Sequence, residues 1–263
     1  MPYAAVNGVE LHYRIDGDRH GSAPWLVLSN SLGSDMSMWT PQVAELAKHF
    51  RVLRYDTRGH GRSEAPKGPY TIEQLAGDVL GLLDTLKIAR AHFCGISMGG
   101  LTGIALAARH SERIERVVLS NTAARIGSPE VWVPRAAKAR TEGMLALSEA
   151  VLPRWFTAEF IAREPLVFGF IRDVFVHTDK DGYAANCEAI DAADLRAEAP
   201  GIKAPALVIS GTHDVAATPA QGRELAAAIP GARYVELDAA HISNIELADT
   251  FTTTVLDFLK EQR

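Results

Sequence analysis

The sequence contains very little cysteine and no long apolar run. Only Cys94 and Cys187 occur among the 263 residues, which excludes a framework of disulfide bonds and is typical of a protein from a reducing compartment. The N-terminal stretch lacks a basic segment followed by an apolar one, so we expect no signal peptide. No apolar run approaches the roughly 20 residues that a membrane-spanning helix needs. The sequence therefore predicts a cytoplasmic protein that does not act in a membrane.

The sequence also lacks an excess of positive charge. It has 27 Lys and Arg against 32 Asp and Glu, a formal net charge of −5 at pH 7, so no basic field argues for a nucleic-acid partner. No cluster of His, Cys and carboxylates has metal-ligand spacing, and no dinucleotide fingerprint follows an early strand. We therefore expect no bound metal and no cofactor. A homo-oligomer is compatible with the sequence.

What the sequence does contain is an alternation of short apolar runs with amphipathic stretches. Residues 9–16 alternate apolar and polar side chains, as a half-buried antiparallel strand does, whereas residues 25–29 form a continuous run typical of a buried strand. Residues 71–88 have helical spacing, and Thr71 followed by Gln74 predicts a capping box. The alternation predicts an α/β protein with a mostly parallel sheet and helices on both faces. The further expected strands are 51–56, 91–94, 114–122, 205–214 and 232–240, and the further expected helices are 41–50, 98–110, 220–229 and 245–262.

The stretch from residue 124 to residue 198 breaks this alternation. It contains many Arg and several Phe and has helical rather than strand character. We interpret it as a helical insertion into a core that comprises residues 1–123 and 199–263. Long insertions in compact folds are usually functional, so we expect this one to form a lid, a helical cap over the site. The alternative is a plain extra layer of helices.

Residues 95–99 read Gly-Ile-Ser-Met-Gly and place Ser97 between two glycines, where an expected strand meets an expected helix. A G-x-S-x-G pattern in this context predicts a sharp, strained turn that exposes a nucleophilic serine above the sheet edge. A Cβ at position 95 or position 99 would collide with the chain as it folds back past the strand. The alternative is a small residue at a tight turn, with Ser97 as a weak helix cap.

A serine hydroxyl needs a neighbouring base to act as a nucleophile at neutral pH. In sheets with a serine at this turn, an acid and then a histidine follow along the chain. Asp214 ends the expected strand at 205–214, and His241 lies in the loop after the strand at 232–240. We predict that Ser97 attacks, that His241 accepts and returns the proton, and that Asp214 fixes the histidine tautomer.

Other residues near these positions are less suited to the same roles. Asp238 and Glu246 flank His241 too closely in sequence to reach its far nitrogen easily. His213 is expected to be structural or to face solvent. The acid can also stand one strand earlier in such sheets, but the expected strand at 114–122 offers no carboxylate. These exclusions make Asp214 the predicted acid.

Acyl transfer also needs hydrogen-bond donors for the oxyanion. The backbone N–H of Met98 lies at the start of an expected helix, where the helix dipole favours negative charge. We expect the second donor in the loop after residues 25–29, and the N–H of Leu32 is the candidate. Such loops usually begin with His and Gly, whereas Asn30 and Ser31 stand here, so the sequence does not fix the geometry of this donor.

Residues 55–63, with the sequence YDTRGHGRS, contain two glycines and two arginines and raise the alternative of a phosphate-binding loop. No Lys-Ser or Lys-Thr pair of a P-loop follows, and no helix is expected to begin at once. We therefore interpret this stretch as a structural turn.

These motifs together resemble those of the α/β-hydrolases and, more narrowly, of the 3-oxoadipate enol-lactonases of bacterial aromatic degradation. The resemblance spans residues 28–246 and implies an α/β-hydrolase fold, with a mostly parallel, twisted, eight-stranded sheet and a helical cap. SNSLG at residues 29–33 and GYAANCEAI at residues 182–190 are its more specific pieces. Haloalkane dehalogenases and epoxide hydrolases have Asp at the position of Ser97, which argues against both. The other stretches that carry the resemblance are residues 51–63, 92–103, 119–127 and 239–246.

The resemblance implies hydrolysis of a five-membered enol-lactone with an acetate arm to 3-oxoadipate, through an acyl-enzyme on Ser97 and with Asp214 and His241 as its partners. The carboxylate of this small-molecule substrate needs a cation, and the donor fork of an arginine fits a carboxylate. Among the arginines of the insertion we choose Arg135, with Trp132, as the substrate-binding pair. The other candidates are Arg125, Arg140, Arg154, Arg163 and Arg172.

Because a fold does not fix the chemistry that it carries, other functions stay open. The same scaffold suits a general carboxylesterase, a cofactor-free perhydrolase or a hydrolase of carbon–carbon bonds. An alternative of a different class is a small-molecule receptor that keeps the three residues. A purely structural role gives no reason for Ser97, Asp214 and His241 all to fall at one predicted sheet edge.

Overall fold

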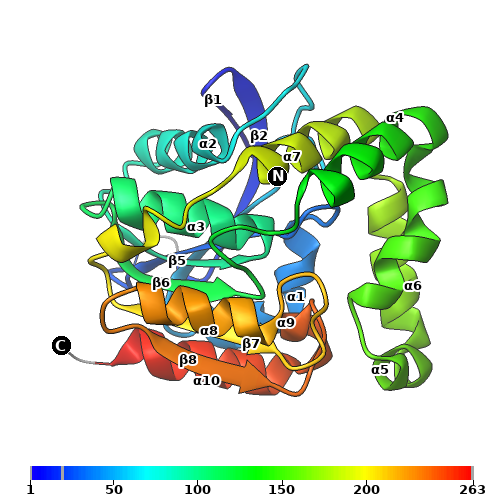
Figure 1. Ribbon diagram of the computed structural model, residues 1–263. Helices are drawn as coiled ribbons and strands as arrows, with labels where there is room; N and C mark the ends of the chain where they lie inside the picture. The colour runs from blue at the N-terminus through cyan, green and yellow to red at the C-terminus, as the bar shows by residue number, and fades with distance from the viewer. Residues whose placement is uncertain (1, 19–20, 262–263) are drawn as a thin grey trace.

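The computed structural model describes residues 2–18 and 21–261 and has one eight-stranded sheet at its centre (Figure 1). Its strands are β1 (Tyr3–Val6), β2 (Val9–Asp16), β3 (Trp25–Ser29), β4 (Arg51–Tyr55), β5 (Ala91–Ile96), β6 (Ile114–Ser120), β7 (Ala206–Gly211) and β8 (Arg233–Leu237). The strand order is β1-β2-β4-β3-β5-β6-β7-β8. The pairings β1–β2 and β2–β4 are antiparallel, and all the others are parallel. The predicted mostly parallel sheet is thus confirmed.

The burial of the strands follows their place in the sheet. Every residue of β5 and of β7 is buried, because these strands lie inside the sheet and helices cover both of its faces. In the edge strand β1, buried and exposed residues alternate instead. Strand β1 is not among the expected strands, although the sequence contains a signal for it. Asn7 and Gly8, which join β1 to β2, have φ of 46° and 73°, as the favoured Asn-Gly dipeptide of a type I′ hairpin does.

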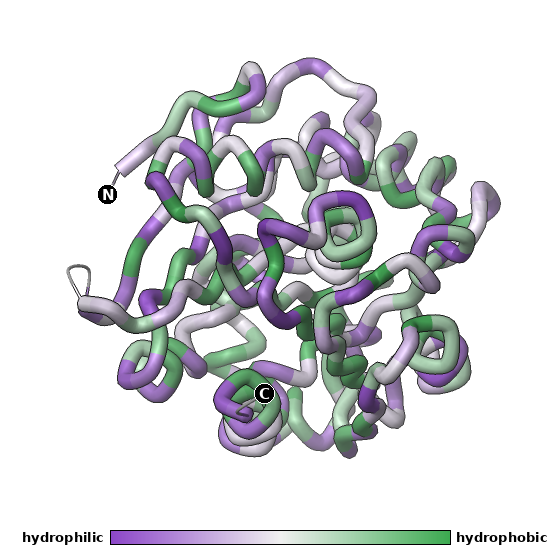
Figure 2. The backbone as a smooth tube through the Cα atoms, turned by 90° about the vertical axis from the view of Figure 1, so that its left-hand side faces the viewer, coloured by the Kyte–Doolittle hydropathy of each residue, from purple (hydrophilic) through white to green (hydrophobic). Residues whose placement is uncertain are grey.

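The helices of the core lie on the two faces of the sheet (Figure 1). Helices α2 (Ile72–Thr85), α3 (Met98–Arg109) and α8 (Pro219–Ala228) share one face, and α1 (Thr40–Leu46) and α10 (Ala248–Lys260) pack together on the other. Figure 2 shows hydrophobic and hydrophilic residues on the same outer helices, as expected for amphipathic helices that cover a sheet. The capping box predicted at Thr71 and Gln74 is present.

The end of the chain differs from the expectation of one closing helix over 245–262. A short helix, α9 (Ser243–Glu246), precedes α10, and Leu247 separates them with a non-helical φ of −124° and ψ of 55°. The expected last residue of that helix, Gln262, lies outside the described residues.

Residues 124–198, which we call the helical insertion, connect β6 to β7. Their helices are α4 (Pro129–Val151), α5 (Ala158–Arg163), α6 (Pro165–Val176) and α7 (Lys180–Ala192). Helix α4 packs against α7 along much of its length, and it changes direction at Gly143, where φ is 82°. In Figure 1, α4, α5 and α6 stand beside the sheet on the right, and α7 crosses near the top. The predicted helical character of this stretch is therefore present.

Two further observations bear on the environment of the chain. Cys94 and Cys187 are both free and buried. Within residues 2–18 and 21–261, none of the helices combines the length and the apolar character that crossing a bilayer requires.

Candidate active site

Ser97 lies between β5 and α3, in the turn that its flanking glycines predict. Its backbone has φ 57° and ψ −113°, a strained conformation that persists only where its surroundings enforce it. A Cβ on Gly95 would lie 2.2 Å from the carbonyl oxygen of Gly99, and a Cβ on Gly99 would lie 2.4 Å from that of Ser29. Both predicted collisions are therefore real. The Ser97 hydroxyl does not cap α3, which removes the weak-cap alternative.

Asp214 and His241 form a buried, hydrogen-bonded pair. Nδ1 of His241 lies 2.8 Å from Oδ2 of Asp214, and both residues are 3% exposed. Oδ1 of Asp214 accepts hydrogen bonds from the backbone N–H groups of Ala216 and Ala217, at 2.8 and 3.0 Å. Burial alone would raise the pKa of Asp214, but the contacts with His241 and with the two amides outweigh burial and lower it. The ionised carboxylate thus holds the imidazole and leaves Nε2 for another partner.

Ser97, Asp214 and His241 follow three parallel strands that end at the same edge of the sheet. Ser97 follows β5, Asp214 follows β7 and His241 follows β8. The intervening strand β6 connects them, because Ser97 N donates to Ser120 O at 3.0 Å and Asn121 N donates to Ile209 O of β7 at 2.7 Å. The structure therefore gathers at one edge residues that lie 144 positions apart in the sequence, from 97 to 241.

Asn121, which is not among the predicted site residues, joins these loops through hydrogen bonds. Its side chain is completely buried, and its Nδ2 donates to Oδ2 of Asp214 and to the carbonyl oxygen of Ala240, both at 3.1 Å. Its Oδ1 accepts from the hydroxyl of Ser243 at 2.6 Å. The signal was an amide directly after a strand where a carboxylate was sought. An amide can donate to Asp214, whereas a second carboxylate there would repel it.

The loop of His241 is also hydrogen-bonded to the helical insertion. Ile242 N donates to the carbonyl oxygen of Trp155 at 3.0 Å. The carboxylate of Glu246 accepts from Ala240 N at 2.8 Å and from Thr157 N at 3.1 Å, and it also accepts from the Thr157 hydroxyl. Glu246 therefore holds the loop in position. Through these contacts, the position of the helical insertion is linked to the position of His241.

Leu32 and Met98 present the two N–H groups predicted for an oxyanion. Met98 is the first residue of α3, so its N–H has no acceptor within the helix. Leu32 N donates no hydrogen bond to the part of the chain that the structure describes. The two segments touch, because a Cβ on Gly99 would lie 2.4 Å from Ser29 O and 3.0 Å from Asn30 O. Two N–H groups without an acceptor among the described residues therefore lie on segments that touch each other next to the turn of Ser97.

Asn30 stands where such loops usually have histidine, and its amide braces the loop. Its Nδ2 donates to the carbonyl oxygens of Ser31 and Ser34, at 3.0 and 2.8 Å, and its Oδ1 accepts from the hydroxyl of Thr57 at 2.7 Å. The side chain is fully buried. An asparagine at the first position of this loop can thus brace it where such loops usually have a histidine.

Trp132 and Arg135, the predicted substrate-binding pair, lie in the first turns of α4. The Arg135 guanidinium lies 5.1 Å from the ring centre of Trp132 and 5.5 Å from that of Tyr183, and its Nε donates to the Tyr183 hydroxyl at 2.6 Å. The ring of Tyr183 reaches the loop that follows β3, residues 30–35, which we call the oxyanion loop after its predicted role, since a Cβ on Gly33 would lie 3.0 Å from the ring. Arg135 is therefore one side chain away from the residue next to Leu32.

Arg135 differs from other arginines of the insertion in its partners. Within residues 2–18 and 21–261 no carboxylate forms an ion pair with it, although it is partly buried. Arg125 pairs with Asp194, Arg140 with Glu188 and Arg163 with Glu164; Arg154 donates to the carbonyl oxygen of Val215, and Arg172 is exposed.

Two weaker candidates from the sequence have other roles. The side chain of His213 is 56% exposed and lies 2.8 Å from a carboxylate oxygen of Asp238, as expected for a solvent-facing residue. Tyr55 is the last residue of β4, and the rest of the stretch 55–63 forms a turn with no helix. The carboxylate of Asp56 in this turn accepts from the backbone N–H groups of Met36 and Arg62, at 2.8 and 3.0 Å, so a phosphate would meet a negative charge there.

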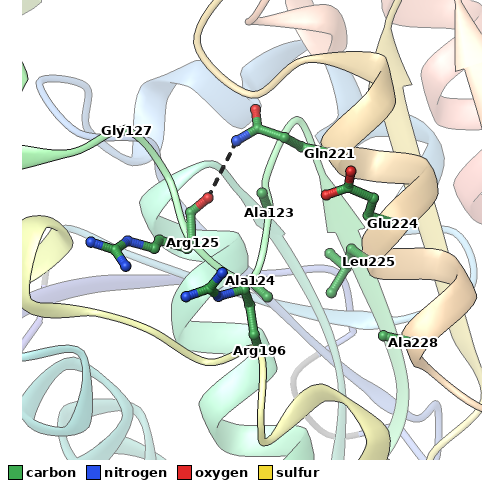
Figure 3. Close-up of a pocket in the computed structure, with 9 residues that line it drawn as sticks. All are labelled: Ala123, Ala124, Arg125, Gly127, Arg196, Gln221, Glu224, Leu225 and Ala228. Carbon is green, nitrogen blue, oxygen red and sulfur yellow. Dashed lines mark hydrogen bonds between the residues drawn. The ribbon is translucent and has the colours of Figure 1, made fainter.

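A cavity of 380 Å³ opens elsewhere, between the segment after β6 and helix α8 (Figure 3). Figure 3 shows Gln221 and Glu224 on the α8 side and the guanidinium groups of Arg125 and Arg196 across from them. Nε2 of Gln221 donates to the carbonyl oxygen of Arg125 at 3.5 Å. Ser97, Asp214 and His241 do not line this cavity, so we place no catalysis in it. Its lining residues are Ala123, Ala124, Arg125, Gly127, Arg196, Gln221, Glu224, Leu225 and Ala228.

Among residues 2–18 and 21–261, no group of three or more His, Cys, Asp and Glu side chains is placed to hold a metal ion.

The known proteins that resemble this chain agree with the fold described above. The family model of the alpha/beta hydrolase fold matches residues 24–247. 3-Oxoadipate enol-lactonase 2 of Acinetobacter baylyi is 42% identical over 252 residues, and enol-lactonase 1 of the same organism is 37% identical over 253 residues; each alignment covers 96% of this chain and 94% of the relative. The crystal structure of the enol-lactonase from Burkholderia xenovorans LB400 superposes with a TM-score of 0.98 at 83% identity, covering 99% of this chain and 100% of the other.

Proposed function

The chain belongs to the α/β-hydrolase family, and from that premise we propose that it is a serine hydrolase that opens the lactone ring of 3-oxoadipate enol-lactone. The observation that carries the proposal is that the strained turn of Ser97 and the buried Asp214–His241 pair follow strands that end at the same edge of the sheet, where the N–H groups of Leu32 and Met98 have no acceptor among the described residues. The similarity to relatives named enol-lactonases supports the choice of substrate.

The proposed reaction begins with attack of the Ser97 hydroxyl on the lactone carbonyl. Nε2 of His241 takes the hydroxyl proton, and Asp214 stabilises the imidazolium that forms. The carbonyl oxygen becomes an oxyanion that accepts hydrogen bonds from the N–H groups of Leu32 and Met98; one such donor contributes about 3 kcal/mol to lowering a barrier of this kind. Collapse of the tetrahedral intermediate breaks the ring C–O bond, and the ring oxygen departs as an enolate.

The second half of the reaction releases the product from Ser97. The departing enolate takes a proton and becomes a ketone, which makes acylation favourable. A water molecule activated by His241 then attacks the ester carbonyl, and the same two N–H groups hold the second oxyanion. The ester bond to Ser97 breaks, the serine regains its proton, and 3-oxoadipate leaves.

We propose that Arg135 binds the free carboxylate on the acetate arm of the substrate, beside Trp132. It lacks a carboxylate partner in the described residues and lies one side chain away from the oxyanion loop. A partly buried guanidinium that lies over aromatic rings and donates one hydrogen bond to a hydroxyl retains further donors for an incoming carboxylate. A neutral ester would leave those donors unused.

In this proposal the helical insertion, residues 124–198, is a lid on a core of residues 1–123 and 199–263. Its contacts with the loop of His241 and with Gly33 support that role. The free, buried Cys94 and Cys187 fit a cytoplasmic enzyme, and a homo-oligomer is compatible with it.

Replacing Arg135 with alanine is expected to raise KM for the enol-lactone by about 10- to 100-fold, because a charged hydrogen bond of ~1.5–3 kcal/mol is lost. KM for a neutral aryl ester should change less than about threefold. Steady-state kinetics with both substrates measures the difference. Arg140→Ala is the matched control, since Arg140 lies on the same helix and pairs with Glu188. Equal effects of Arg135→Ala on both substrates would refute the assignment.

Replacing Asn121 with alanine is expected to lower kcat by about tenfold, since Asp214 and Ala240 O lose a shared donor and a buried carboxylate loses part of its support. Asn121→Asp should lower kcat further at neutral pH, because it places a second carboxylate within hydrogen-bond distance of Asp214. Steady-state kinetics and thermal unfolding, measured on the same variants, distinguish an effect on the active site from an effect on the fold. Unchanged kcat in both folded variants would show that Asn121 has no role in positioning the acid.

Assays of the enol-lactone against simple aryl esters test the proposed function as a whole. We expect fast multiple turnover of the lactone, with kcat/KM well above that for any aryl ester. Higher kcat/KM for the esters would favour a general carboxylesterase. Turnover of a peracid-forming mixture or of a carbon–carbon substrate, in place of the lactone, would favour those chemistries. Binding without turnover would favour a small-molecule receptor.

A further inference from the structure

The direction of the Leu32 N–H depends on the two peptide groups that flank Leu32. The first is held at the carbonyl oxygen of Ser31, which accepts from Asn30 Nδ2 at 3.0 Å, from the Ser34 hydroxyl at 2.8 Å and from Ser34 N at 3.2 Å. In a trans peptide the N–H points opposite to the carbonyl group. The bonds at Ser31 O therefore turn the Leu32 N–H away from the loop's own acceptors.

The second flanking peptide is held by His60, from the turn at residues 55–63. Nε2 of His60 lies 2.8 Å from the backbone nitrogen of Gly33. Because Gly33 N can only donate, Nε2 must be the unprotonated acceptor. The ring proton is therefore on Nδ1, which lies 3.3 Å from the carbonyl oxygen of Arg58 and donates to it. His60 thus bridges the turn and the oxyanion loop in one defined tautomer.

The surroundings of His60 keep it in this neutral form. The residue is 1% exposed, and burial lowers its pKa to about 4, although the nearby charges of Asp35 and Asp179 act in the opposite direction. A protonated ring would have no acceptor to offer to Gly33. The neutral imidazole therefore persists throughout the pH range in which a serine hydrolase works.

The helical insertion holds the same turn from its other side. A Cβ on Gly59 would lie 2.8 Å from the backbone of Gly182 in α7, so the two chains touch through glycines. Nδ2 of Asn186, also in α7, donates to Arg58 O at 2.9 Å, the same oxygen that His60 contacts. The turn is thus fixed between the insertion and the oxyanion loop.

We propose that His60 is a positioning residue for the oxyanion hole, acting as the hydrogen-bond acceptor that fixes the Leu32–Gly33 peptide and so aims the Leu32 N–H at the reacting carbonyl oxygen. This rests on the proposed function in that Leu32 must serve as an oxyanion donor. The proposed role of His60 applies equally to lactones and to simple esters, since both form the same kind of oxyanion.

The test compares two amide variants that differ by one methylene. His60→Gln can place its Oε1 near the position of Nε2 and accept from Gly33 N, whereas His60→Asn reaches only as far as Nδ1 and keeps only the contact with Arg58 O. We expect His60→Asn to lower kcat by about 10- to 100-fold with KM within about twofold of the wild type. His60→Gln should keep kcat within about threefold of the wild type.

A second readout isolates the oxyanion. A trifluoromethyl ketone forms a tetrahedral adduct with the serine, and its inhibition constant should rise in His60→Asn by the same factor by which kcat/KM falls. The matched control is His92→Asn. His92 is a buried histidine of β5, 6% exposed, and the hydrogen bonds of the described residues do not connect it to the oxyanion loop. The His92→Asn variant should therefore have the kcat and the inhibition constant of the wild type.

The outcomes separate the two proposals. Wild-type protein that turns over aryl esters but not the enol-lactone overturns the proposed substrate and leaves the role of His60 to be read from the ester data. Equal kcat values for His60→Asn and the wild type, or equal losses in the Asn and Gln variants, overturn the role of His60. If His60→Asn does not fold, a loss of kcat beyond threefold in folded His60→Gln overturns it, and retention of kcat with an unchanged inhibition constant supports it.

Discussion

Replacing Ser97 with alanine is expected to lower kcat for the enol-lactone by about 10⁴- to 10⁶-fold. The variant keeps the turn, the proposed oxyanion donors and the proposed substrate-binding groups, but it has no atom that can form the acyl-enzyme. What remains is the modest acceleration that binding and two N–H groups give to direct attack by water. Progress curves at high enzyme concentration, corrected for spontaneous hydrolysis of the lactone, measure the loss.

Two controls show whether this loss comes from chemistry. Ser97→Ala should unfold at a temperature within a few degrees of the wild type, because alanine keeps the Cβ at this strained position and the Ser97 hydroxyl does not cap α3. His241→Ala should cost about as much as Ser97→Ala, and the double variant should cost no more than either, since the two residues act as a unit. More than about 1% of wild-type kcat in folded Ser97→Ala would contradict a serine nucleophile.

Replacing Asp214 with asparagine is expected to lower kcat by about 10³- to 10⁴-fold. In the native site the hydrogen-bond partners that the described residues offer to the carboxylate are all donors: His241 Nδ1 and Asn121 Nδ2 face Oδ2, while the backbone N–H groups of Ala216 and Ala217 face Oδ1. An amide has one oxygen and one NH₂ group. In either orientation the NH₂ group faces hydrogen-bond donors. Either His241 loses its defined tautomer, or the turn at Ala216 and Ala217 loses its hydrogen-bond acceptor.

The pH dependence and a second variant refine this prediction. Because the pKa of Asp214 is held below its ordinary value, the carboxylate stays ionised at all pH values where His241 acts as a base. The folded protein gains stability from this above the unfolded pKa of the carboxyl and loses it as the pH falls through the lower folded value. Asp238→Asn is the matched control, since Asp238 pairs with His213 at the surface; it should leave kcat unchanged. A loss below tenfold in Asp214→Asn would contradict the role of the acid.

The sequence predicts the elements of this fold well because local patterns determine them. The strand at 9–16 has the bounds of β2, and the run at 25–29 those of β3. The turn of Ser97 is also a local matter, since steric collisions at positions 95 and 99 require the glycines. The choice of Asp214 and His241 rests on where parallel strands end, which chain order largely fixes.

The parts that the sequence does not reveal are long-range side-chain contacts. Asn121 reaches Asp214 and Ser243 across about a hundred residues, and Glu246 binds Thr157 in the insertion. Nothing in the local pattern around Asn121 states which loops it will meet. The His60 bond to Gly33 is similar, because a turn with two glycines predicts only a turn. The prediction of helix boundaries fails for a related reason. The break at Leu247 lies within an apolar pattern, and it depends on how α9 packs.

The most direct test of the central claim is mass spectrometry of the protein quenched with acid within milliseconds of mixing with excess enol-lactone. A lactone has no departing fragment, so ring opening by a serine adds the full mass of the substrate to the enzyme. We predict this adduct on the peptide that contains Ser97, its decay as product forms, and its absence from Ser97→Ala. Turnover without any adduct at rate-saturating substrate, together with undiminished activity of Ser97→Ala, would contradict the account.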